Sequence, residues 1–136
     1  MRILMILAMC QMAVAEDRMR RETIALTILA EARGEGEGGM YRVGCVIQQR
    51  SIERKLSPDK ICLQKSQFAK GERWMLGSPS APYAIKLAEH LIRGHSLHRD
   101  IVGNANHFCT LKTNPKWARG RNPVAIFGNH KFFRLR

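Results

Sequence analysis

The 136-residue sequence lacks the short motifs that mark several enzyme classes. It has no G-x-S-x-G nucleophile motif, no H-E-x-x-H zinc motif and no phosphate-binding glycine loop. The glycine-rich stretch GEGEGG at 34–39 lacks the Lys-Ser/Thr ending of a P-loop, and its two carboxylates would repel phosphate. His95, His98 and Asp100 have neither a zinc-motif context nor paired Cys ligands, which favours a solvated loop over a metal site.

Acidic residues are also scarce. The chain has 11 Asp and Glu against 23 Lys and Arg, which gives a formal net charge of +12. Such a surface favours a polyanionic partner: nucleic acid, a membrane face or an anionic cell-wall polymer. With 45% hydrophobic and 25% charged residues, the composition is that of one globular domain. No repeat or linker follows residue 16.

The first 15 residues resemble a signal peptide. Met1-Arg2 is a minimal positive region, residues 3–14 (ILMILAMCQMAV) are apolar, and Ala13-Val14-Ala15 fits a small-x-small cleavage site. The apolar stretch is shorter than the ~20 residues that a membrane-spanning helix needs. We therefore expect an exported protein, in the periplasm or outside the cell at the wall, with residues 16–136 as the mature chain. An ordinary apolar first helix is the alternative.

Three of the four cysteines lie in the predicted mature chain. Cys45 lies in the apolar run VGCVI, which predicts a buried thiol. Cys62 and Cys109 have more polar surroundings and are the candidate disulfide pair of an exported protein, although the sequence gives no connectivity.

Hydrophobic periodicity predicts helices first and an irregular segment after them. Helices are expected over residues 22–32, 38–55 and 81–93, with a third, short one beginning at Ser57-Pro58-Asp59. From Asp100 onward the chain is rich in turn residues, with short β-prone pieces. This order predicts an α+β domain.

Glu31 lies in the last turn of the first predicted helix, and two more glutamates, Glu35 and Glu37, follow it within six residues. In the last turn of a helix the unpaired carbonyls disfavour a carboxylate by roughly 0.3–1 kcal/mol, and apolar neighbours act in the same direction. Both effects raise a carboxyl pKa, as a general acid requires. The alternative is a surface residue at a frayed helix end. Glu35 and Glu37 lie beyond Gly34, where we expect them to be solvated.

The C-terminal segment combines aromatic faces with amides and imidazoles. Sugar rings favour this mixture because their faces carry C–H and their edges carry hydroxyls. Stacking on nucleic-acid bases and a small aromatic core are the alternatives. The residues concerned are Asn106, His107, Phe108, Trp117, Asn129, His130, Phe132 and Phe133.

Several stretches, in order, resemble the cell-wall hydrolase family that includes the spore cortex-lytic enzymes (SleB-like). They are AEARGE (30–35), VGCVIQQR (43–50), ICLQKSQF (61–68), ANHF (105–108), NPKWA (114–118) and GNHKFF (128–133). Gly36-Glu37-Gly38-Gly39 departs from the family's usual Pro-x-Glu-Gly, and Gln49 replaces its usual Asn.

The resemblance implies a small lysozyme-like α+β domain that cleaves peptidoglycan between N-acetylmuramic acid and N-acetylglucosamine, as a lytic transglycosylase or a muramidase. It implies Glu31 as the catalytic acid/base and a substrate groove lined by Gln67, Phe68, His107, Phe108 and Trp117. No metal or cofactor is expected. The expected partners of this monomer are glycan strands and anionic wall polymers, without a dedicated nucleic-acid or membrane partner. The alternatives are a non-catalytic cationic protein that binds the wall or nucleic acid, and a wall amidase.

Overall fold

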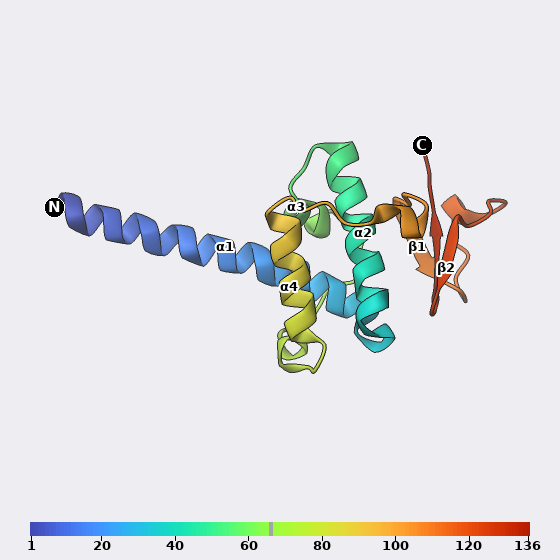
Figure 1. Ribbon diagram of the computed structural model, residues 1–136, viewed down its shortest axis with the longest axis horizontal. Helices are drawn as coiled ribbons and strands as arrows, with labels where there is room; N and C mark the ends of the chain where they lie inside the picture. Colours follow the sequence, from blue (N-terminus) through green and yellow to red (C-terminus); the bar gives the residue numbers. More distant parts are fainter. Residues whose placement is uncertain (66) are drawn as a thin grey trace.

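A computed structural model describes residues 1–65 and 67–136 of the chain. Four α-helices precede a small antiparallel sheet (Figure 1), which confirms the predicted α+β class. The α-helices are α1 (Arg2–Ala32), α2 (Gly36–Arg54), α3 (Pro58–Leu63) and α4 (Ala81–Ile92), and the strands are β1 (His107–Thr110), β2 (Ala125–Phe127) and β3 (His130–Phe133). Short 3-10 helices lie between them: η1 (Arg33–Glu35), η2 (Arg73–Gly77), η3 (Arg99–Val102) and η4 (Lys116–Ala118).

Helix α1 is longer than the predicted 22–32 because it continues through the apolar N-terminal stretch. Its first part projects from the body of the protein (Figure 1), and its first buried residue is Ile24. Within the described part of the chain, no helix is long and apolar enough to cross a membrane.

The core lies between α1, α2 and α4. Each contributes apolar residues at helical spacing, as the periodicity predicted: Ile24, Ile28, Leu29 and Ala32 from α1, Val43, Val46 and Ile47 from α2, and Ala84, Leu87, Ala88 and Leu91 from α4. Ile52 is an apolar residue of the predicted helix 38–55, but it is 54% exposed because it lies on the opposite face of α2 from Val43 and Ile47. Ser57 precedes α3 and Pro58 begins it, as predicted.

The sheet has the order β1-β3-β2, with both pairs antiparallel. His107 is opposite Phe133 and Phe108 is opposite Phe132, so β3 supports the strand that carries the predicted groove residues. Phe132 belongs to the hydrophobic core, and Phe133 packs edge-on against Trp117 at 5.3 Å between ring centroids. The interpretation of these two phenylalanines as a small aromatic core is therefore confirmed.

The four cysteines are all free, so the expected Cys62–Cys109 pair is wrong for this structure. The two residues belong to different parts of the fold. Cys62 lies on α3, which packs against α1, whereas Cys109 lies on β1. Cys45 is fully buried in α2, as predicted.

Candidate active site

Glu31 lies in the last turn of α1, where it is half-buried. Its Oε1 accepts a hydrogen bond of 2.5 Å from the backbone N–H of Ala69. Burial raises the pKa of this carboxyl above its ordinary 4.5, against the opposing effects of the Ala69 hydrogen bond and of the electrostatic influence of His130 and Arg50. The predicted raised pKa is confirmed, and its largest cause is desolvation.

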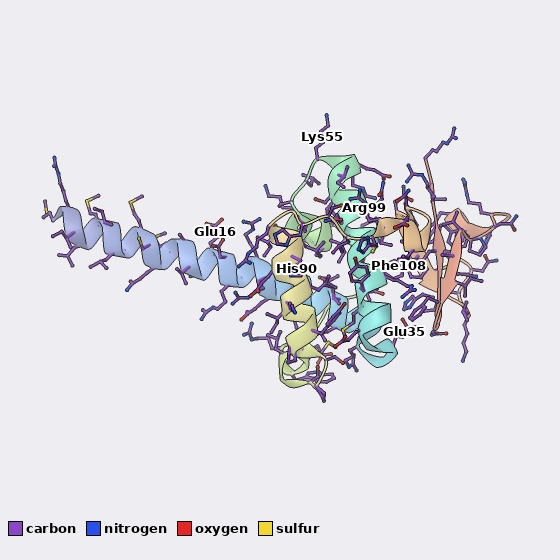
Figure 2. The ribbon with its side chains drawn as sticks, viewed as in Figure 1. Glu16, Glu35, Lys55, His90, Arg99 and Phe108 are labelled. Carbon is purple, nitrogen blue, oxygen red and sulfur yellow. The ribbon has the colours of Figure 1, made fainter. Side chains whose placement is uncertain are left out.

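Glu35 is not solvated, which corrects the sequence-based expectation. Its side chain is 16% exposed and bonds to the turn that begins β3, from the helical side of the fold (Figure 2). Oε1 accepts from the N–H of Asn129 at 2.7 Å, and Oε2 lies 2.8 Å from Nδ1 of His130. Both carboxylate oxygens are therefore engaged by the segment 94 and 95 residues further along the chain. Glu37 is exposed, as predicted.

Two glycines make room for the Glu35 side chain. A Cβ at Gly39 would lie 2.5 Å from the Cβ of Glu35, and a Cβ at Gly128 would lie 3.0 Å from its Oε1. Gly128 also has a φ of +55°, which favours glycine. The glycine-rich stretch 34–39 thus has a local role in seating a carboxylate against the β2–β3 turn.

A groove of about 610 Å³ lies between α2, Gln67, β1 and the segment 113–117. Four of the five predicted substrate-binding residues line it, Gln67, His107, Phe108 and Trp117, together with Arg50, Cys109, Thr113, Asn114 and Pro115. The fifth, Phe68, lines a neighbouring groove of about 710 Å³ with Ala69, the residue that binds Glu31.

Phe68 lies next to both grooves. Its ring centroid is 6.0 Å from that of Phe108, and the Arg50 guanidinium carbon lies 4.6 Å above its ring. Glu31 itself lines neither groove. It accepts a hydrogen bond from Ala69, which lines the groove of Phe68, and it is attracted by the charge of Arg50, which lines the groove of His107. Glu31 and the predicted groove residues therefore lie in one region of the molecule.

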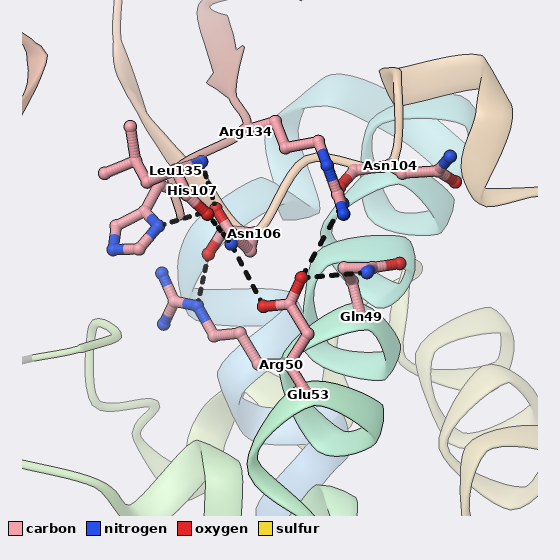
Figure 3. A network of polar contacts seen from close by, with 8 residues as sticks. All are labelled: Gln49, Arg50, Glu53, Asn104, Asn106, His107, Arg134 and Leu135. Carbon is pink, nitrogen blue, oxygen red and sulfur yellow. Dashed lines mark hydrogen bonds and ion pairs between the residues drawn. The ribbon is translucent and has the colours of Figure 1, made fainter.

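Asn106 connects α2 to the chain after β3 (Figure 3). Its Nδ2 donates to Glu53 Oε2 at 3.0 Å and to the carbonyl of Leu135 at 2.6 Å. Its carbonyl accepts from Nε of Arg50 at 2.5 Å, and its Oδ1 accepts from the N–H of Leu135 at 2.8 Å. Since Nδ2 faces two acceptors and Oδ1 faces a donor, this network fixes the orientation of the amide.

The same network fixes the tautomer of His107. Its Nδ1 lies 2.9 Å from Asn106 Oδ1, which can only accept, so Nδ1 carries the proton and Nε2 has a free lone pair. Burial, followed by the positive charges of Arg50 and Arg54, lowers the pKa of His107 to about 4. At neutral pH this imidazole is an uncharged hydrogen-bond acceptor in the groove.

Arg50 was not a candidate in the sequence, although its position carries a signal. It lies four residues after Val46 and three after Ile47, in register with the buried face of α2, where a charged side chain is unusual. Only 3% of Arg50 is exposed.

The comparisons with known proteins identify one family. The family model described as Cell Wall Hydrolase matches residues 34–133. That range includes Glu35, Arg50, His107 and His130 and begins just after Glu31. No curated protein and no solved structure matches the chain.

Proposed function

Because the chain belongs to the cell wall hydrolase family, we propose that it cleaves the glycan strands of peptidoglycan with Glu31 as the general acid. The scissile bond joins N-acetylmuramic acid to N-acetylglucosamine, in a lysozyme-like domain related to the spore cortex-lytic enzymes. The observation that carries this proposal is a half-buried carboxyl of raised pKa beside two adjacent grooves, with Phe68 and Phe108 between them.

The first step needs a carboxylic acid that keeps its proton near neutral pH. Glu31 protonates the glycosidic oxygen as the bond from that oxygen to C1 of the muramyl sugar breaks. Since burial raises the pKa of Glu31, its protonated fraction at a given pH exceeds that of a solvated glutamate. Activity should therefore fall as pH rises through that raised pKa.

The second step fits intramolecular attack better than a second carboxylate. Hydrolases that retain or invert configuration use a pair of carboxyl groups. Both oxygens of Glu35 are engaged by Asn129 and His130, and Glu37 is exposed. The muramyl 6-hydroxyl can attack C1 instead and return its proton to Glu31. The product is a 1,6-anhydromuramyl end, which makes the reaction a lytic transglycosylation.

Location and partners follow from the same proposal. The net charge of +12 suits a wall that carries peptide carboxylates and anionic polymers. The hydrophobic core begins at Ile24, so removal of residues 1–15 as a signal peptide would leave the core intact. We propose that the mature protein is an exported monomer. Its N-terminal residue after export should be Glu16.

The test is digestion of purified peptidoglycan by wild type, Glu31→Gln and, as a matched control, Glu37→Gln. Mass spectrometry of the products separates anhydromuramyl ends, reducing ends and freed peptides, which report transglycosylase, hydrolase and amidase activity. We expect anhydromuramyl ends, and a loss of about 10²–10⁴-fold for Glu31→Gln with the fold retained by circular dichroism. A folded Glu31→Gln protein with most of its activity would refute the role of Glu31.

A further inference from the structure

Arg50 is a buried cation that lines the groove, and not all of its N–H donors have an acceptor among the described residues. Its Nε donates to the carbonyl of Asn106, and its guanidinium carbon stacks on Phe68. Nη1 is buried, and no residue in the described parts of the chain accepts a hydrogen bond from it. A buried guanidinium donor without an acceptor is costly, so this side chain gains from a ligand oxygen that approaches the guanidinium from the groove. The residue lines the same groove as His107.

His107 brings the complementary group. Its Nδ1–H is used by Asn106, so only the Nε2 lone pair remains for a ligand, and that atom accepts a hydrogen bond. The ring packs against Trp117 at 5.0 Å between centroids, which leaves an apolar surface beside the acceptor. Arg50 and His107 are both anchored on Asn106 and lie on the same side of it (Figure 3).

We propose that Arg50 and His107 form a subsite for a secondary amide of the wall polymer. The amide carbonyl accepts from the Arg50 guanidinium, and the amide N–H donates to His107 Nε2. A carboxylate fits less well, since it has no hydrogen to donate and the His107 lone pair would repel it. A sugar hydroxyl can also accept from Arg50 and donate to His107, but only through a single oxygen, whereas an amide does so through two separate atoms.

The inference rests on the proposed function, and peptidoglycan offers this amide in two places. One is the N-acetyl group on each sugar, whose methyl group could pack on Trp117. The other is the amide that joins the muramyl lactyl group to the stem peptide. Both present one carbonyl and one N–H on a planar group, so the experiment has to distinguish them.

Binding is measured on the full chain carrying Glu31→Gln, so that the result does not depend on turnover. Three soluble ligands are compared: glycan strands with stem peptides, strands stripped of stems by an amidase, and stripped strands that are chemically de-N-acetylated. The variant His107→Phe keeps a flat ring against Trp117 but removes the acceptor, and His107→Gln restores an acceptor. His98→Phe, at an exposed histidine away from the groove, is the matched control.

We expect His107→Phe to weaken binding of strands that carry the recognised amide by about 10- to 100-fold, the effect of one buried hydrogen bond to substrate. His107→Gln should recover most of that loss, and His98→Phe should change nothing. If the loss disappears on stem-free acetylated strands, the stem amide is bound. If it persists there and disappears only after de-N-acetylation, the sugar N-acetyl group is bound. De-N-acetylation also creates amines, which repel Arg50 equally in the parent protein and in the His107 variants. Their effect therefore cancels when the Kd of a variant is divided by the Kd of the parent for the same ligand.

An equal loss on all three ligands, or no loss on any, would overturn the subsite. Arg50→Lys is a second test, because it keeps the charge but not the planar guanidinium. This variant should also lose the difference in affinity between ligands that carry the recognised amide and those that lack it. The subsite and the proposed function fail in different ways. Absence of glycan cleavage by the wild type refutes the function, whereas binding that ignores the amide refutes only the subsite.

Discussion

Replacement of Glu35 by Gln should destabilise the protein, because this carboxylate joins the helices to the sheet. It accepts hydrogen bonds from Asn129 and His130 with 16% of its side chain exposed. Hydrogen bonds to a charged group contribute about 1.5–3 kcal/mol each, and neutral ones about 0.5–1.5 kcal/mol. The Gln side chain keeps one oxygen that can accept from the Asn129 N–H. Its NH2 group replaces the second oxygen, so the hydrogen bond from His130 is lost. The expected loss is roughly 1–3 kcal/mol.

Thermal and urea unfolding, each followed by far-UV circular dichroism, measure this loss. For a domain of this size 1 kcal/mol corresponds to roughly 3–6 °C in Tm. Glu37→Gln is the control, since Glu37 is exposed and its substitution should change stability by less than about 0.5 kcal/mol. Equal Tm values for the two variants would show that Glu35 is solvated after all. The contacts with Asn129 and His130 would then contribute nothing measurable to stability.

Three other outcomes are expected. Gly71→Ala should cost about 1–3 kcal/mol because its Cβ would collide with the backbone carbonyl of Leu26, whereas Gly77→Ala, with open space around it, should be nearly neutral in the same unfolding assay. His107 should titrate near pH 4 by NMR. Its folded pKa lies below the ordinary 6.5, so its contribution to stability is complete above about pH 6.5 and is lost as pH falls toward 4. Burial raises the thiol pKa of Cys45 and Cys62 to about 12, so native protein should react there with a thiol reagent far more slowly than after unfolding; fast labelling of either would contradict the packing.

The helical half of the fold could be predicted because its signals are local. Periodic apolar residues placed both ends of α2 and α4 to within one or two residues, and Pro58 after Ser57 placed the start of α3. Glu31 could be placed in the last turn of α1 for the same reason, and its apolar neighbours predicted the burial that raises its pKa. The pairing of the strands could not be predicted, since each strand has only three or four residues and little alternation.

The errors in the site concern contacts between distant parts of the chain. Glu35 lies past a glycine in a polar stretch, and only the fold brings Asn129 and His130 to it. The cysteine pair failed for a similar reason, because α3 and β1 hold Cys62 and Cys109 in separate environments. The role of Arg50 depends on Asn106, 56 residues later, although its place on the buried face of α2 was visible in the sequence.

Glu31, in the last turn of α1, and Glu35, in η1, show how position decides chemistry. Glu31 has one backbone hydrogen bond and a burial cost that raises its pKa, which suits proton transfer. Glu35, four residues later, has both oxygens engaged and holds β3, which in turn pairs with the strand that carries His107 and Phe108. Through these contacts Glu35 holds the strands of the groove in place relative to Glu31, and neither of its carboxylate oxygens is free. A loss of activity in a Glu35 variant should accordingly come with a loss of stability, whereas a loss in Glu31→Gln should not.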